Sequence, residues 1–184
     1  MVSLSPGGGL IQALVAIVEV TPCDFDQASD IDLVIVTDDE ISNDLFSALQ
    51  AMHARIAIID SPWATQLEVS YIPQRALRRY DPIHALHPHL DRGSGESLRM
   101  MKHDSDWVVQ RYTLRERGVT LAGPAPQTLI DHVSPNDLRR AMLSIMWWPT
   151  QILADPVQIN ERGYQSYIVL TMCRILYTLM RISS

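Results

Sequence analysis

Two mainly apolar runs and one amphipathic segment organise the first half of the chain. The runs at residues 33–36 and 67–72 are bounded by polar residues or proline, and they predict two buried strands. Between them, apolar side chains recur at three- and four-residue steps, which predicts a helix from Ser42, as N-cap, to about Arg55 (Leu45, Leu49, Met52, Ile56). The order strand, helix, strand indicates an α/β arrangement for this part of the chain.

The other elements follow from similar patterns. An apolar segment at residues 10–20, ended by Pro22, predicts a helix, and residues 82–96, rich in Pro, Gly, Ser and His, predict a loop. The remaining predicted elements are a turn or short helix at 74–79, a helix at 104–118 capped by Gly118, a strand at 119–122, a helix from Ser134 to about Trp148 and a last helix at about 162–182. The chain is therefore predicted to become purely helical after residues 123–135.

Three acidic residues lie on the two predicted strands. Asp30 and Asp32 stand two positions apart at the start of the first strand, and Glu68 interrupts the second. Because residues two apart on a strand point to the same face, Asp30 and Asp32 are expected to project together. Grouped carboxylates suit Mg²⁺, which binds a few carboxylates together with substrate phosphates. The three acids therefore predict metal-assisted phosphoryl or nucleotidyl transfer.

A structural explanation of the same acids stays open. Asp-x-Asp occurs often by chance, and acids beside strands commonly form turns or solvated strand ends. Glu68 argues against this explanation, because an acid in the middle of a strand core needs a partner.

The sequence around these acids resembles the aminoglycoside nucleotidyltransferases, specifically the streptomycin/spectinomycin adenylyltransferase-like group. The resemblance runs in order through DFD at 24–26, SDIDLVIV at 29–36, LEV at 67–69, LRERGVTLAGP at 114–124 and VLTMCRILY at 169–177. It implies an α+β fold, in which a mixed-sheet, polymerase-beta-like nucleotidyltransferase domain (residues 1–125) precedes a partial helical domain (residues 126–184). It also implies transfer of AMP from ATP to a hydroxyl of an aminoglycoside-type antibiotic.

The resemblance assigns roles to individual residues. It implies that Asp30 and Asp32 hold ATP and Mg²⁺, and that Glu68 is a third metal-binding carboxylate and the general base toward the antibiotic hydroxyl. It further implies that Ser29 donates to a phosphate oxygen and that Arg174, on the last helix, reaches the triphosphate. ATP and Mg²⁺ are thus the expected cofactors.

Two acids are candidates for binding the antibiotic. Asp155 and Glu161 lie just before the last helix, where the family places acids that bind the amino or guanidino groups of the drug. The alternative for each is a solvated loop acid. Trp147 and Trp148 invite stacking on a sugar ring, although aromatic residues at helical spacing usually pack in a core, so at least one is expected there.

The chain departs from the family pattern in two places. The family carries a Gly-Ser pair that grips the triphosphate shortly before the Asp pair, whereas residues 16–21 here read AIVEVT. The family also continues past the helix of Arg174 with a lysine that contacts ATP and further helices, whereas this sequence ends at Ser184. The alternative expectation is therefore a catalytically impaired or inactive, truncated remnant. A less favoured third alternative is a nucleotidyltransferase that modifies a protein partner.

The charge and residue composition limit the classes of molecule that the chain is expected to bind. The net charge of −6 argues against binding to a nucleic-acid backbone and is compatible with a cationic small molecule. Cys23 and Cys173 have no metal-binding spacing and are expected to be buried thiols in a reducing cytoplasm. His84, His87 and His89 lie in the predicted loop and are expected to be solvated.

The last helix is apolar around its whole circumference. It is short and contains Arg174 and Arg181, so a core helix is expected and not a membrane span. A helix that is apolar on all sides is expected to be buried on all sides. Because further helices cover it in the family, self-association through this helix is expected here.

Overall fold

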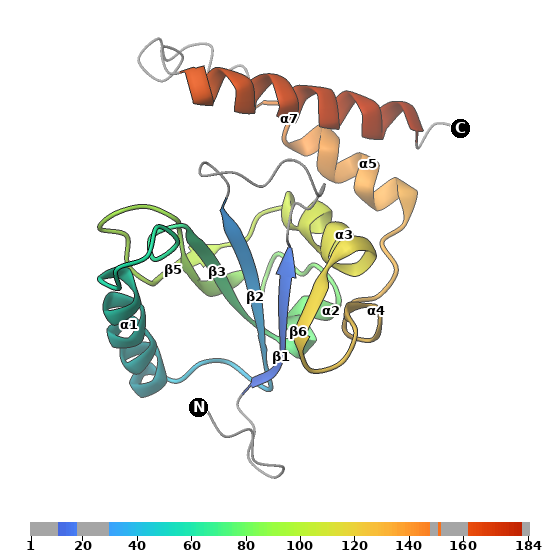
Figure 1. Cartoon of the computed structure of the whole chain (residues 1–184). Coiled ribbons are helices and arrows are strands. Elements are labelled where there is room, and N and C mark those ends of the chain that lie inside the picture. Colours follow the sequence, from blue (N-terminus) through green and yellow to red (C-terminus); the bar gives the residue numbers. More distant parts are fainter. Residues whose placement is uncertain (1–10, 18–29, 148–150, 152–161, 182–184) are drawn as a thin grey trace. The chain divides into compact units, whose positions relative to one another are not determined.

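The structure, a computed structural model, describes residues 11–17, 30–147, 151 and 162–181. Six strands form one mixed sheet in the order β5-β4-β3-β2-β1-β6 (Figure 1). Strands β2 and β3 are parallel, and the other described neighbours are antiparallel. The strands are β1 (Ile11–Ile17), β2 (Ile31–Thr37), β3 (Leu67–Pro73), β4 (Leu86–Leu90), β5 (Arg99–Lys102) and β6 (Val119–Ala122).

The described helices are α1 (Asn43–Ala57), α2 (Gln74–Arg78), α3 (Trp107–Arg117), α4 (Pro126–Leu129), α5 (Pro135–Ser144) and α7 (Arg162–Arg181). The chain divides into two compact units. Unit 1 contains residues 1–104 and 113–132 and holds the sheet, and unit 2 contains residues 105–112 and 133–184. The predicted boundary between two domains at residues 125/126 is a different division from these two units, and it stays a prediction.

Helix α1 connects the two parallel strands and covers one face of the sheet. Parallel neighbours need such a crossover connection, and a helix is the usual one. Phe46 and Leu49 of α1 pack against the buried Val69 and Tyr71 of β3 in a cluster that includes Leu90 of β4. Burial of these apolar side chains fixes which face of β2 and β3 looks toward α1.

Two serine caps begin helices where the sequence predicted them. Ser42 Oγ accepts a hydrogen bond from the backbone N–H of Leu45 at 3.3 Å at the start of α1. Ser134 Oγ accepts from the N–H of Asp137 at 3.1 Å at the start of α5, where Pro135 occupies the first helical position. The predicted strands around Asp32, Glu68 and residues 119–122 are likewise confirmed.

Three predicted elements are wrong. Residues 11–17 form strand β1 and not a helix, since they pair with β2 on one side and β6 on the other. The predicted loop at 82–96 contains β4, which pairs with β3 and β5. Helix α5 ends at Ser144 and does not reach Trp148. The sequence analysis also missed β5.

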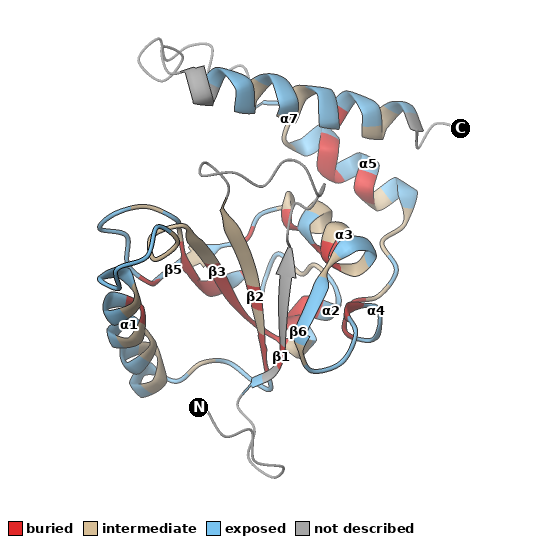
Figure 2. Ribbon diagram, in the orientation of Figure 1, coloured by how far each residue is buried: buried red, intermediate tan, exposed pale blue. Residues whose placement is uncertain are grey.

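Unit 2 has its own small core. Leu138 and Met142 of α5 and Ile175 of α7 are buried together, with Met172 and Leu179 packed at the edge. The rest of α7 is largely exposed (Figure 2), including Leu170, Leu176, Tyr177 and Met180. Among the described residues, no helix is both long and apolar enough to span a membrane.

Candidate active site

Three carboxylates meet at the start of the parallel strands. Asp30 immediately precedes β2, Asp32 lies in β2, and Glu68 lies beside Asp32 in β3, where the two residues are paired in register. One carboxylate oxygen from each residue lies within 4.8 Å of the others, and all three residues are half-buried. The structure therefore brings together the three acids that the sequence singled out.

Strand alternation explains why these acids share a face. The apolar cluster under α1 contains Leu33 of β2 and Val69 of β3, each one position away from an acid. Successive side chains on a strand point to opposite faces, so Asp32 and Glu68 project away from α1. Parallel neighbours lie about 4.8 Å apart, which places both carboxylates within reach of one ion.

The donor set fits a hard divalent cation. Carboxylate oxygens are ligands that Mg²⁺ prefers, and half-buried acids leave open positions for water or substrate oxygens. Histidine and cysteine, which favour softer metals, do not belong to this group of three. Asp30, Asp32 and Glu68 are therefore the residues that could hold Mg²⁺.

Glu68 lies in an environment that disfavours its ionised form. Burial raises the pKa of Glu68 above its ordinary value, and the negative charges of Asp91 and Asp30 raise it further. The positive charge of Arg92 opposes this rise. A carboxyl group whose pKa is raised toward neutrality is a better general base than an ordinary surface acid.

A buried histidine connects Glu68 to a chain of polar groups. Burial raises the pKa of Asp91, but the hydrogen bonds from Arg99 and His89 and the positive charge of Arg99 outweigh burial and leave the pKa lowered. Asp91 is therefore ionised and accepts, so Nε2 of His89 donates to its Oδ1 at 3.2 Å. Nδ1 of His89 then accepts from Ser70 Oγ at 2.7 Å. This arrangement fixes the tautomer of the imidazole.

The same Nε2 atom lies 3.9 Å from Oε1 of Glu68. Burial lowers the pKa of His89, so the imidazole is neutral at pH 7 and supplies an N–H dipole and no full positive charge. Ser70 and His89 are paired neighbours on β3 and β4, so the sheet itself holds this donor beside Glu68.

The predicted solvated state of the loop histidines is wrong for two of the three. His87 and His89 are each 1% exposed on β4, and the ring of His87 packs at a tilt of 59° against the buried His103 with ring centres 5.0 Å apart. They alternate with Pro88 and Leu90 and thus share one face of a strand. His84 does lie at the surface, where it hydrogen-bonds Asp81 at 2.8 Å.

The other residues that the sequence singled out lie in unit 2 or outside the described residues. Arg174 lies on the exposed surface of α7 in unit 2. Ser29, Asp155 and Glu161 lie outside the described residues, as do Cys23 and Trp148. Trp147 is exposed. Cys173 is also exposed, which contradicts the prediction of a buried thiol.

Sequence reasoning missed Arg92 and Asp91, and it considered His89 only as a solvated loop residue. Arg92 Nη1 lies 2.8 Å from Asp30 Oδ2, so a cation stands directly at the acidic group. The signal that could have revealed this segment is the two-residue spacing of His87 and His89 between leucines, which is a strand pattern.

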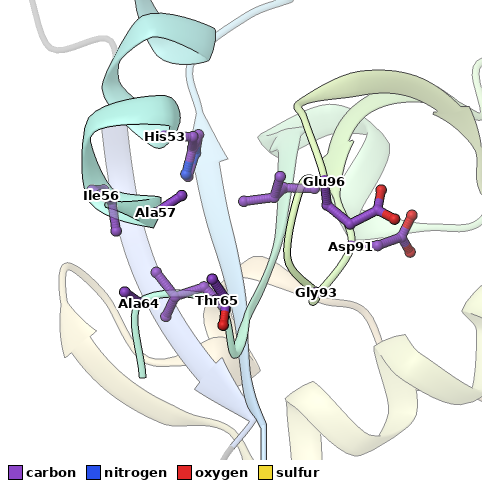
Figure 3. A pocket seen from close by; sticks show the side chains of 10 residues that line it. His53, Ile56, Ala57, Ala64, Thr65, Asp91, Gly93 and Glu96 are labelled. Carbon is purple, nitrogen blue, oxygen red and sulfur yellow. The ribbon is translucent and has the colours of Figure 1, made fainter. Parts of the chain in front are cut away.

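A small cavity lies beside this site but is not part of it. It is bounded by the end of α1 and by the loop that follows β4, including His53, Ala57, Gly93 and Glu96 (Figure 3). Its volume of about 20 Å³ is room for about one water molecule. Asp30, Asp32 and Glu68 do not line it, so substrate binding is argued from the acids and not from this cavity.

Comparison with known proteins supports the fold. The structure is similar to that of spectinomycin adenyltransferase AAD(9) from Enterococcus faecialis, solved with ATP and spectinomycin, with a TM-score of 0.67. The alignment has 16% sequence identity and covers 92% of this chain and 68% of that chain. No protein-family model matches the sequence, and no curated protein matches it significantly. The predicted α+β fold, and with it the resemblance to aminoglycoside nucleotidyltransferases, is confirmed at the level of the fold.

Proposed function

We propose that this chain is a Mg²⁺-dependent nucleotidyltransferase that transfers AMP from ATP to a hydroxyl of an aminoglycoside-type antibiotic such as streptomycin or spectinomycin. One observation carries the proposal: the carboxylates of Asp30, Asp32 and Glu68 converge within 4.8 Å on the parallel strands. They do so in a fold similar to that of an adenyltransferase solved with ATP and spectinomycin.

Asp30 and Asp32, with Glu68, would hold the metal. Bound Mg²⁺ would supply neutralisation of the negative charge that develops on the departing pyrophosphate. The protein's own contribution is a fixed array of oxygen ligands, which the register of β2 and β3 sets before any ligand arrives. Such preorganisation lowers the cost of reaching the transition state.

Glu68 would act as the general base. The hydroxyl oxygen of the antibiotic attacks the α-phosphorus of ATP, the bond from that phosphorus to the bridging oxygen breaks, and pyrophosphate leaves. Glu68 would take the hydroxyl proton. His89 would border the Glu68 carboxylate, with Nε2 3.9 Å from Oε1 and its N–H donated to Asp91, and would not itself touch the substrate.

The remaining assignments also belong to this proposal. Ser29 would bind a phosphate oxygen, Arg174 would reach the triphosphate, and Asp155 and Glu161 would bind cationic groups of the antibiotic. The nucleotidyltransferase domain would end near residue 125 and the helical domain would follow. The reaction would take place in the cytoplasm, where ATP is available.

The test is pyrophosphate release from ATP in the presence of Mg²⁺ and either streptomycin or spectinomycin. Glu68→Gln keeps the shape of the side chain but removes the base, so it should lower kcat by about 10²–10⁴-fold. Glu116→Gln, an exposed acid on α3, is the matched control and should leave the rate unchanged. Equal rates for the Glu68→Gln and wild-type proteins would refute the assigned role of Glu68. Absence of antibiotic-dependent release by the wild-type protein would favour the impaired or inactive alternative.

A further inference from the structure

Arg92 is a cation placed at the edge of the acidic group. Its guanidinium Nη1 lies 2.8 Å from Oδ2 of Asp30. The Arg92 side chain is 50% exposed and that of Asp30 is 34% exposed, so the pair is open to solvent. The charge of Arg92 also acts on Glu68. Exposed ion pairs of this kind contribute little to stability, so stability alone does not explain a cation at this position.

The backbone on both sides of Arg92 is firmly held. Asp91, the preceding residue, is bonded through its carboxylate to His89 and Arg99. The N–H of Gly93, the following residue, donates to the carbonyl oxygen of Thr65 at 2.8 Å. The loop therefore presents Arg92 from a fixed position, while the side chain remains free to exchange partners at the surface.

Gly93 shows that this loop conformation is specified by the sequence. Its φ of +132° lies in the region that favours glycine, and a Cβ at this position would meet Cγ of Glu96 at 3.3 Å. The direction in which the chain leaves Arg92 thus depends on a residue without a side chain. This links the placement of the guanidinium to the local backbone.

A metal ion at Asp30 would compete with the guanidinium for the same carboxylate oxygens. A displaced guanidinium is available to another anion, and its planar fork of N–H donors matches phosphate oxygens.

We propose that Arg92 exchanges partners during nucleotide binding: it holds Asp30 in the metal-free protein and binds a phosphate of the nucleotide once metal occupies the acids. This inference rests on the proposed function, and it adds a phosphate-binding residue from the loop after β4. It makes two opposite predictions for removal of the guanidinium. Metal alone should bind at least as tightly, because a competing cation is lost, whereas ATP with metal should bind more weakly.

The experiment uses Mn²⁺ as the metal probe. Binding of Mn²⁺ without nucleotide is measured by electron paramagnetic resonance of the free ion, and binding of ATP with saturating Mn²⁺ is measured by calorimetry without antibiotic. Arg92→Ala should bind Mn²⁺ equally or more tightly and ATP about 10- to 100-fold more weakly, and Arg92→Lys should recover part of the ATP affinity. Arg75→Ala is the matched control, since Arg75 is similarly exposed and pairs with Asp39 and Glu40.

Each outcome decides the inference. Unchanged ATP affinity in Arg92→Ala would overturn it while leaving the proposed function intact. Parallel loss of Mn²⁺ and ATP binding would also overturn it, because that result shows a structural role for the ion pair, and circular dichroism would show whether the variant is folded. A wild-type protein that binds no ATP would overturn the proposed function and this inference with it.

Discussion

Asp32 and Glu68 are paired neighbours on the parallel strands β2 and β3, although thirty-five residues separate them in the chain. Their carboxylates point away from helix α1, which covers the opposite face. The crossover through α1 is what makes the two strands parallel and adjacent. The chemistry proposed for this chain therefore depends on one local pattern, Asp-x-Asp, and on one long-range register.

Loss of one carboxylate should weaken metal binding directly. We expect Asp32→Asn to lower the affinity for Mn²⁺ at least tenfold, because an ionised ligand is replaced by a neutral amide among hard-oxygen donors. Asp60→Asn, an exposed acid after α1, should leave the affinity unchanged. The measurement is Mn²⁺ titration followed by electron paramagnetic resonance. Equal affinity of the Asp32→Asn and wild-type proteins would show that the acids do not form a metal site.

The sequence predicted the three acids because their signals are local. Alternation along a strand puts Asp30 and Asp32 on one face whatever the rest of the fold does. The register that pairs Asp32 with Glu68 is a tertiary property, which no single-strand pattern contains. Glu68 was singled out by its position in an apolar strand, and the resemblance to a known family then assigned it to the same site as the two Asp residues.

The wrong predictions have equally specific causes. Residues 11–17 are a short apolar run, and such a run does not distinguish a buried strand from a buried helix. Pro88 and the polar histidines made residues 86–90 look like a loop. The ladder between β3 and β4 contains only the pairs Val69–Leu90 and Ser70–His89, so Pro88 does not interrupt it.

Stability should fall on mild acidification because of His53. This residue of α1 is buried, and its Nε2 lies 2.8 Å from Oη of Tyr71. Burial lowers the pKa of His53 below its unfolded value of 6.5. The unfolded chain therefore binds a proton first, so the free energy of unfolding is highest above pH 6.5. It should then fall by up to about 1.4 kcal/mol per pH unit toward the lower folded pKa.

The measurement is urea unfolding at several pH values between 5 and 8. His53→Gln should be less stable at pH 8 but should lose less stability on acidification than the wild-type protein. Ser47→Ala is the control, since Ser47 is an exposed residue of the same helix with no titratable group and should leave the pH dependence unchanged. His89, whose pKa is also lowered, acts in the same direction and should leave a residual pH dependence in the His53 variant.

Helix α7 should mediate self-association. One side of it packs on α5 through Ile175, whereas Leu170, Leu176, Tyr177 and Met180 are each more than half exposed. Contiguous exposed apolar surface is unusual on a monomer and is commonly covered by another chain. We expect sedimentation at tens of micromolar to show an oligomer that Leu176→Asp disrupts. Leu143→Asp, at an exposed apolar position on α5, should not disrupt it. A monomeric wild-type protein would contradict the prediction.

The missing Gly-Ser pair should limit the rate of transfer. Residues 18 and 19 are Val and Glu, and a glutamate near the triphosphate would repel it, whereas the family's serine hydroxyl and glycine N–H would donate hydrogen bonds. Loss of one fixed donor at a developing charge costs about 10²–10³-fold in rate at comparable oxyanion sites. We therefore expect the double variant Val18→Gly, Glu19→Ser to release pyrophosphate faster than the wild-type protein with ATP and streptomycin or spectinomycin.

The control adds Glu68→Gln to the double variant. If the faster pyrophosphate release depends on Glu68 as the general base, this third substitution should abolish the gain in rate. A wild-type rate equal to that of the double variant would show that the departure at residues 18 and 19 does not matter. Arg92 would then be the natural source of the compensating phosphate contact, since its guanidinium already stands 2.8 Å from Asp30. In that case, adding Arg92→Ala to the double variant should cost less ATP affinity than Arg92→Ala costs alone, because the restored pair supplies donors of its own.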